Sequence, residues 1–227
     1  MRIDIISVVP NLMESFFAHS ICKRAAQAGL VEVNLHDLHD YSTKKHKQID
    51  DYPFGGGAGM VISAEPLAHC LDSLMEKRVY DDVIFFSPDG LVFKQGLANQ
   101  LSLCENLIFI CGHYKGIDER IRVKYVTKEI SIGDYVLSGG ELAAAVCADA
   151  IIRLIPGAIG DEMSALTDSF QDGLLAPPVY TRPALWNGME VPDILRSGND
   201  KKIEAWRHEQ AVSRTKTRRP DLLESND

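Results

Sequence analysis

Three short strand-like runs, the first two mainly apolar and each followed by a turn of small residues, constrain the fold of this chain more than any other feature. The runs cover residues 82–86, 106–111 and 125–130, and their turns begin at Ser87, Gly112 and Ser131. Strands that are apolar throughout are typical of a parallel sheet with both faces buried. A helical pattern precedes each run, at residues 65–77, 95–103 and 117–124. The pattern predicts an α/β domain whose three turns gather at one edge of the sheet.

The first part of the chain supports the same fold class. Residues 2–9 and 31–38 have strand patterns, and a helical pattern lies between them at residues 11–29. The spacing places four residues of this helix on its buried side, namely Leu12, Phe16, Ile21 and Ala25. Strand, helix and strand in this order are the start of an α/β domain.

A basic segment and a glycine-rich segment come next. Residues 40–54 are polar and contain three lysines, so we expect an exposed basic loop. Residues 55–59 read G-G-G-A-G, and no Gly-Lys-Ser/Thr follows, so the segment is not a P-loop. Two interpretations remain open for these glycines. They form either a tight turn that admits a large planar substrate group or a simple turn into the next strand.

Residues 128–141 hold the densest ligand-binding signal in the chain. Gly133, Gly139 and Gly140 permit positive φ angles and close approach of the backbone to a ligand. Three polar side chains lie among these glycines, those of Asp134, Tyr135 and Ser138. An apolar helix is predicted directly afterwards, at residues 142–154. The pattern indicates a loop around a flat, polar small molecule, although a turn without a ligand also fits this loop taken alone.

The last third of the chain predicts a linker and a small helical domain. Residues 158–175 show little periodicity and are expected to be a flexible linker, and three prolines then indicate an extended segment. A helix is predicted at residues 199–211, with Ile203, Trp206 and Gln210 on one face. The predicted division is a sheet domain at 1–157, a linker at 158–175 and a helical domain at 176–227.

Charge is unevenly distributed along the sequence. The net charge is −8, yet residues 196–219 contain eight Lys and Arg against three Asp and Glu, a local charge of +5. Local clusters of positive charge bind phosphates even when the total charge is negative. We therefore take four residues as candidate contacts to nucleic-acid phosphates, Arg214, Lys216, Arg218 and Arg219. A solvated basic helix without a nucleic-acid partner explains the same pattern.

Composition indicates a cytoplasmic protein without a membrane segment. The chain is 45% hydrophobic and 25% charged, and no apolar run approaches the roughly 20 residues that span a bilayer. The five cysteines are an odd number without C-x-x-C spacing, and no signal-peptide pattern is present. His36 and His39 lack a third ligand nearby in the sequence, so we predict no metal site there.

Several motifs together resemble a known enzyme family. They are G-H-Y-K-G-I-D-E-R at 112–120, S-I-G-D-Y-V-L-S-G-G-E-L at 131–142, D-S-F at 168–170, Y-T-R-P at 180–183 and L-R-S-G-N at 195–199. In this order they resemble the bacterial tRNA (guanine-N1)-methyltransferases, over essentially the whole chain. The resemblance implies transfer of a methyl group from S-adenosyl-L-methionine to N1 of guanosine 37, next to the anticodon. It also implies a deep trefoil knot in the sheet domain and a homodimer with shared active sites.

The resemblance assigns roles to residues of the three turns and of the linker. It implies that S-adenosylmethionine contacts Phe86, Ser87, Pro88, Gly112, Tyr114, Gly116, Ser131, Ile132, Gly133, Asp134, Tyr135, Val136, Leu137, Gly139 and Gly140. It implies Asp168 as catalytic base and Arg153 as the assisting cation. Where many members of the family have glutamate, this chain has Lys115, which puts a role for that carboxylate, or for Mg²⁺, in doubt.

Alternatives remain open for both the function and the base. His113 is the only histidine in one of the three turns, and an imidazole suits general-base chemistry. Asp168 also fits a helix cap, and Arg153 also fits a helix C-terminus that favours positive charge. Two other functions are compatible with the sequence: that of a knotted methyltransferase acting on ribose or on ribosomal RNA, and that of a non-catalytic RNA-binding protein.

Overall fold

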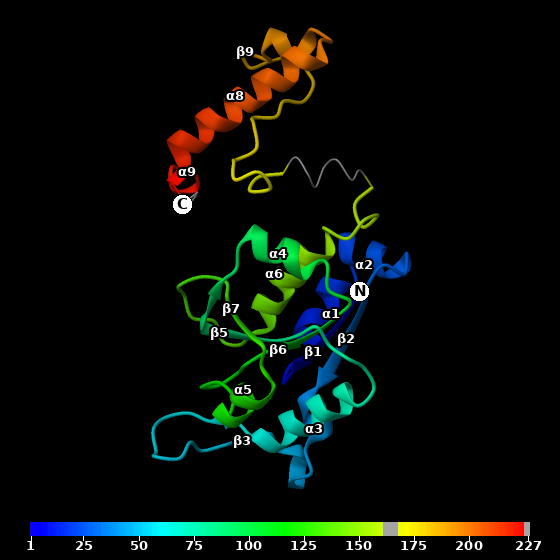
Figure 1. Ribbon diagram of the computed structural model, residues 1–227, viewed down its shortest axis with the longest axis vertical. Coiled ribbons are helices and arrows are strands. Elements are labelled where there is room, and N and C mark those ends of the chain that lie inside the picture. The colour runs from blue at the N-terminus through cyan, green and yellow to red at the C-terminus, as the bar shows by residue number, and fades with distance from the viewer. Residues whose placement is uncertain (161–167, 225–227) are drawn as a thin grey trace. The chain divides into compact units, whose positions relative to one another are not determined.

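The computed structural model describes residues 1–160 and 168–224 of the chain. The chain forms two compact units, Met1–Glu162 and Met163–Asp227 (Figure 1). The first unit contains a central sheet with helices on both faces, and the second contains one long helix and a small hairpin. Part of the predicted linker, residues 161–167, lies outside the described residues.

The central sheet of the first unit has five strands, and every neighbouring pair is parallel. The strands are β1 (Arg2–Ser7), β2 (Glu32–Asp37), β5 (Asp82–Val92), β6 (Asn106–Ile110) and β7 (Lys128–Ser131). Their order in the sheet is β2-β1-β6-β5-β7. The prediction of an α/β fold with a parallel sheet is confirmed. Two short strands, β3 (Asp50–Asp51) and β4 (Val61–Ile62), pair antiparallel on either side of the glycine-rich segment.

Helices cover both faces of this sheet (Figure 1). One face packs against α1 (Asn11–Phe17), α2 (Ser20–Gln27), α4 (Gln95–Leu101) and α6 (Glu141–Ile152). The other packs against α3 (Ala64–Met75) and α5 (Glu119–Tyr125). The predicted inward residues of α3 are buried, namely Leu67, Leu71 and Leu74. Within the described residues, no helix has both the length and the apolar character needed to cross a membrane.

The prediction of one helix over residues 11–29, with Leu12 and Phe16 buried, is wrong. The chain breaks the helix at Ala18 and His19, and Ser20 has a φ of 53°. The break resets the helical phase, so that the buried residue of α1 is Met13. Leu12 and Phe16 are 65% and 38% exposed. Ala25, in α2, is buried as predicted.

The turn predicted at residues 87–90 is part of a longer strand. β5 continues to Val92, and its pairing with β7 shifts register between Phe86 and Leu91. A β-bulge of this kind bends a strand and redirects its side chains. At this irregularity Ser87 is buried, whereas Pro88 and Asp89 are exposed.

The predicted basic loop at residues 40–54 is mostly exposed, but it is more ordered than the pattern indicated. It contains the end of the 3₁₀ helix η1 (Leu38–Tyr41), the 3₁₀ helix η2 (Lys45–Lys47) and the strand β3. Ile49 is buried in the core beside α3. One apolar residue thus fixes a segment whose composition is otherwise polar.

The second unit consists of a long helix, a hairpin and short helical turns. α8 (Asp200–Arg218) begins as predicted, with the Asn199 side chain accepting a hydrogen bond from the Lys202 amide, but it extends seven residues beyond the predicted end. The hairpin of β8 (Leu185–Trp186) and β9 (Met189–Glu190) was not predicted, although Asn-Gly is a strong hairpin signal. The remaining elements are η3 (Asp193–Arg196) and α9 (Asp221–Glu224).

A buried carboxylate on β1 links this strand to three neighbouring side chains. Asp4 of β1 is fully buried and is contacted at 2.7 Å by Arg2 Nε, His36 Nε2 and Tyr80 Oη. Burial alone would raise the pKa of Asp4, but the hydrogen bonds from His36, Arg2 and Tyr80 outweigh it and lower the pKa to about 2. The ionised carboxylate is therefore the form that the fold stabilises.

We expect Asp4→Asn to lower the free energy of unfolding at pH 7 by about 3 kcal/mol, because it removes a buried charge that three partners satisfy. The folded-state pKa of Asp4 lies below its ordinary value of 3.8, so this stabilisation is complete above pH 4 and is lost as pH falls towards 2. Urea denaturation of both proteins at pH 7 and pH 3 measures the effect. Equal urea midpoints at pH 7 would contradict it.

Candidate active site

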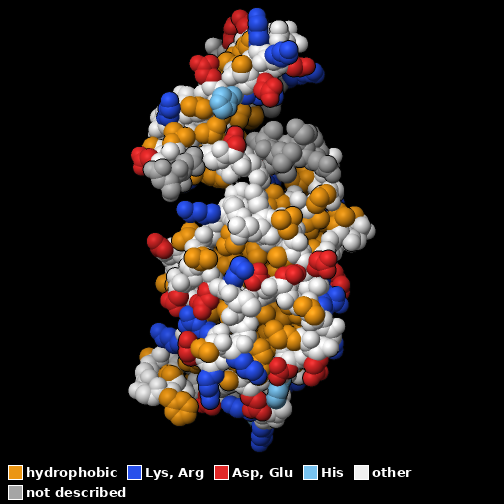
Figure 2. Space-filling view, in the orientation of Figure 1, with side chains coloured by type: hydrophobic (Ala, Val, Ile, Leu, Met, Phe, Trp, Pro, Cys, Tyr) orange, Lys and Arg blue, Asp and Glu red, His pale blue; other side chains and the backbone are white. Residues whose placement is uncertain are grey.

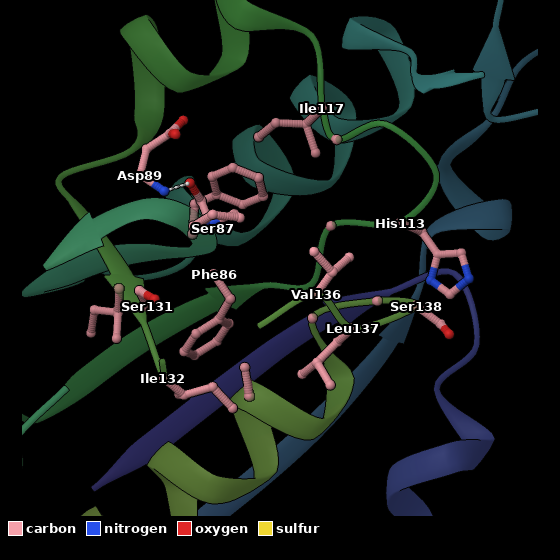
Figure 3. Close-up of a pocket in the computed structure, with 18 of the residues that line it drawn as sticks. Phe86, Ser87, Asp89, His113, Ile117, Ser131, Ile132, Val136, Leu137 and Ser138 are labelled. Atoms are coloured by element: carbon pink, nitrogen blue, oxygen red, sulfur yellow. Dashed lines mark hydrogen bonds between the residues drawn. The ribbon is translucent and has the colours of Figure 1, made fainter. Parts of the chain in front are cut away.

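The three predicted turns meet at the carboxyl ends of β5, β6 and β7 (Figure 3). β5 lies between β6 and β7 in the sheet, so the chain segments that follow these strands are neighbours. Together they enclose a cavity of about 370 Å³. This volume is within the range of small-molecule sites, and the position is the one that α/β sheets use for ligands.

Most of the predicted cofactor-binding residues line this cavity. They are Phe86, Ser87, Pro88, Gly112, Tyr114, Gly116, Ser131, Ile132, Gly133, Tyr135, Val136, Leu137, Gly139 and Gly140. Asp134, the remaining one, is exposed and is not among the lining residues. Further lining residues include Asp89, His113, Ile117, Arg122, Ser138 and Ala143, and most of them flank the same motifs in the sequence.

Backbone contacts hold the second and third turns against each other. The Gly140 amide donates to the Gly112 carbonyl at 2.7 Å, and His113 pairs with Gly139 in an antiparallel bridge. A Cβ atom at Gly140 would lie 2.8 Å from Cys111 Cα, so only glycine permits this approach. Tyr114 has a φ of 57°, an uncommon conformation for a residue with a side chain. Such conformations concentrate at functional sites.

The walls of the cavity combine apolar side chains with backbone polar groups. Phe86, Ile132 and Leu137 line one side in Figure 3, and Ile117 and Val136 also point towards the cavity. Ser87 Oγ accepts a hydrogen bond from the Asp89 amide at 3.0 Å, which stabilises the bulge of β5. Apolar walls with a few polar groups suit a flat heterocyclic ligand that is recognised by main-chain atoms.

Two side chains at the cavity have perturbed pKa values. Hydrogen bonds to Glu129 and Asp89 raise the pKa of Arg122 above its ordinary value, so its positive charge is secure. Burial, and after it the carboxylate of Asp50, raises the pKa of Tyr114. The phenol of Tyr114 therefore stays protonated at neutral pH and can donate a hydrogen bond.

The cysteines are poorly suited to act as nucleophiles. Burial is the largest cause that raises the thiol pKa of all five, Cys22, Cys70, Cys104, Cys111 and Cys147. A thiol with a raised pKa carries little of the reactive thiolate at neutral pH. None of the five cysteines is among the residues that line the cavity, so the structure gives no support for a cysteine adduct there.

The two predicted catalytic residues belong to different units. Arg153 is the C-cap residue of α6 in the first unit, and it is half-buried. Asp168 is half-buried in the second unit. His113, the alternative base, lines the cavity, and its Nδ1 lies 3.7 Å from Oε2 of Glu141.

Lys115 connects the cavity to the glycine-rich segment. Its amide donates to the Met60 carbonyl at 3.0 Å, and its side-chain stem covers Gly59, where an added Cβ would lie 2.9 Å from Lys115 Cγ. In the described part of the chain, no group of three or more His, Cys, Asp or Glu side chains is arranged to hold a metal ion. His36 and His39 each contact an aspartate, Asp4 and Asp37 respectively.

The four candidate tRNA contacts lie at the end of α8 and directly after it. Lys216, Arg218 and Arg219 are exposed, and Arg214 is half-buried. Arg219 forms a two-bond ion pair with Asp221 and lies over the ring of Phe170. Among the described residues, Nε of Arg214 is buried without a hydrogen-bond partner. The structure therefore places these cations on one terminal segment in different environments.

Comparison with known proteins identifies the family. A family described as tRNA (Guanine-1)-methyltransferase TrmD matches residues 1–225. A tRNA (guanine-N(1)-)-methyltransferase of Christiangramia forsetii is 62% identical, over 99% of both chains. Proteins of the same name from Cytophaga hutchinsonii and Bacteroides thetaiotaomicron are 62% and 61% identical over 99% of this chain, and over 95% and 100% of their own lengths. The chain therefore belongs to the tRNA (guanine-1)-methyltransferase family.

Proposed function

We propose that this protein transfers a methyl group from S-adenosyl-L-methionine to N1 of a guanine in tRNA, and that this guanine is guanosine 37. The observation that carries the proposal is the match of residues 1–225 to the family, which includes the three turns around the cavity. The apolar walls and the backbone polar groups fit the adenine of the methyl donor. Position 37 rests on the sequence resemblance.

The cavity supplies orientation and exclusion of water. S-adenosylmethionine, when bound, supplies a methyl group already activated by its sulfonium, so the leaving thioether needs no acid. Glycines at the turns would let main-chain amides and carbonyls approach the adenine, and Ile132 and Leu137, which line the cavity, would supply apolar contacts to it. Holding donor and acceptor in line is itself a large part of catalysis in such a transfer.

The protein must also remove a proton from the guanine. N1 carries a proton at neutral pH, so methylation requires a base for this proton and a cation for the charge that develops on O6. We assign Asp168 as the base and Arg153 as the cation.

Asp168→Asn tests both the reaction and the base. The amide keeps the size of the side chain but cannot accept the N1 proton, so we expect turnover to fall by about 10²–10⁴-fold. Binding of S-adenosylhomocysteine and tRNA should remain. Transfer of a radiolabelled methyl group to a tRNA transcript, with the modified nucleoside and its position identified, measures the reaction.

Three outcomes would overturn parts of this assignment. Wild-type protein that binds S-adenosylhomocysteine but labels only ribose or ribosomal RNA would show a different substrate. Protein without cofactor binding would be a non-catalytic RNA-binding protein. Near-normal turnover in Asp168→Asn, together with loss of turnover in His113→Ala, would move the role of base to the histidine.

We propose further that the protein is a homodimer with active sites shared between subunits. α1 and α6 pack against each other, and each exposes a pair of apolar side chains four residues apart. These are Leu12 and Phe16 on α1, and Leu142 and Val146 on α6, which are 61% and 51% exposed. Figure 2 shows exposed hydrophobic side chains gathered on one face of this unit. Neighbouring apolar side chains at a surface are typical of interaction sites.

Complementation tests the shared site. Gly133→Trp should fill the cavity, and Asp168→Asn should remove the base, so each variant alone should be inactive. If a site combines the cavity of one subunit with Asp168 of the other, each mixed dimer keeps one intact site. An equal mixture should then recover about one quarter of wild-type turnover. No recovery, with subunit exchange verified by native mass spectrometry, would place both residues in one subunit.

The basic segment of α8 is proposed to bind tRNA phosphates. Lys216 and Arg218 are exposed, so changing both to Ala should leave the fold intact while removing two phosphate contacts. We expect a higher KM for tRNA and a salt dependence flatter by roughly one unit of slope per lost contact. Lys201→Ala with Lys202→Ala, on the first turn of the same helix, is a control of equal charge. An unchanged slope in the Lys216/Arg218 variant would contradict the proposal.

The remaining features are proposed from the resemblance and from the sequence patterns. They are a trefoil knot in the sheet domain, a linker at residues 158–175, a helical tRNA-binding domain at 176–227 and a cytoplasmic location. Lys115 replaces the glutamate that many members carry, so we assign no magnesium ligand at this position.

A further inference from the structure

A buried carboxylate lies directly behind the cavity. Glu141, the first residue of α6, is 2% exposed. Its Oε1 accepts a hydrogen bond of 2.7 Å from the hydroxyl of Ser7, a buried residue at the end of β1. The Ser7 hydroxyl in turn accepts from the Val9 amide at 2.9 Å. One oxygen of Glu141 is thus held in place by the end of a core strand.

The other oxygen of Glu141 lies near His113 but is too far from it for a hydrogen bond. Its Oε2 lies 3.7 Å from Nδ1 of His113, which is too long for a hydrogen bond. Nδ1 is buried, and it has no hydrogen-bond partner in the part of the chain that the structure describes. Leaving a buried polar nitrogen unsatisfied is unfavourable. A movement of less than about 1 Å would bring the two atoms to hydrogen-bond distance.

This incomplete contact joins the second and third turns of the cavity. His113 belongs to the turn after β6, and Glu141 ends the loop after β7. A Cβ atom at Gly139 would overlap both Oε2 of Glu141 and Nδ1 of His113, so the glycine leaves the space through which they meet. Figure 3 shows His113 beside Ser138 at the edge of the cavity. Closing the contact would draw the two turns together around a ligand.

We propose that Glu141 is a positioning residue for the methyl-donor pocket. Ser7 holds Oε1, and Oε2 accepts a hydrogen bond from Nδ1–H of His113 when S-adenosylmethionine or its product occupies the cavity. Both the neutral Nδ1–H tautomer and the imidazolium can donate this bond. Part of the binding free energy of the ligand is then linked to closure of the turns. This inference rests on the proposed function, because it assumes that the cavity is the methyl-donor site.

Glu141→Gln tests the proposal. Glutamine retains the size of the side chain and an oxygen for Ser7, but it presents an amide NH₂ group to Nδ1–H. Since a hydrogen bond to a charged group is lost, we expect the Kd of S-adenosylhomocysteine, measured by calorimetry, to rise by roughly tenfold or more. The KM for S-adenosylmethionine should rise similarly, with little change in kcat at saturation or in the KM for tRNA. A general loss of structure would not weaken binding of the methyl donor while leaving kcat and the KM for tRNA nearly unchanged.

Asp82→Asn is a matched control for loss of a buried carboxylate. Asp82 is buried at the amino end of β5, away from the three turns, and pairs with Lys128 at 2.8 Å. This variant should lower the melting temperature without changing the Kd of S-adenosylhomocysteine. An equal rise in Kd for Asp82→Asn and Glu141→Gln would show that Glu141 acts only through stability, and would overturn the proposal.

Two measurements keep the proposal testable if Glu141→Gln folds poorly. His113→Asn should raise the Kd in the same way, and in a double-mutant cycle the two effects should be far from additive. In the wild-type protein, ¹⁵N spectra of the histidine rings should show a hydrogen-bonded Nδ1–H of His113 on addition of S-adenosylhomocysteine. Additive effects, or an unchanged His113 signal, would contradict the contact. Wild-type protein that fails to bind S-adenosylhomocysteine would contradict the proposed function itself.

Discussion

Burial of the sheet on both faces determines where this protein can bind a ligand. Within the five parallel strands, the backbone polar groups pair with neighbouring strands and the side chains enter one of two apolar cores. Polar groups become available only where the strands end. β6, β5 and β7 are adjacent, so their carboxyl-terminal turns converge, and the bond from the Gly140 amide to the Gly112 carbonyl closes two of them against each other. The position of the cavity is thus a consequence of strand order.

This dependence explains which features could be predicted from sequence. Apolar runs such as residues 106–111 are local signals, so the strands and the fold class were predicted correctly. The cavity was found through the small residues that follow each run, without knowledge of strand order. The bulge of β5 depends on its pairing with β7, and the break before Ser20 depends on how α1 and α2 pack on the sheet. Ser87-Pro88-Asp89-Gly90 gave a local turn signal, but the continuation of β5 beyond it depends on pairing with β7.

The cluster of Ser7, Glu141 and His113 shows a further limit of prediction from the sequence. Ser7 and Glu141 are 134 positions apart in the sequence and meet only because β1 and α6 adjoin in the core. In the sequence, Glu141 is an acidic residue in the first turn of a helix, a position where such residues are common for reasons of the helix dipole alone. Only burial and distance distinguish it from an ordinary surface glutamate.

The distribution of residues between the two units has a functional consequence. Every residue that lines the cavity belongs to the first unit, whereas Asp168 and the basic residues of α8 belong to the second. Among the described residues, the lining of the proposed donor pocket thus comes from the first unit alone. The geometry of this pocket depends on contacts among β1, the turn after β6 and α6. We therefore expect substitutions at these contacts to change the affinity for the methyl donor. We expect substitutions of Asp168 and of the basic residues of α8 to act instead on the steps that require tRNA.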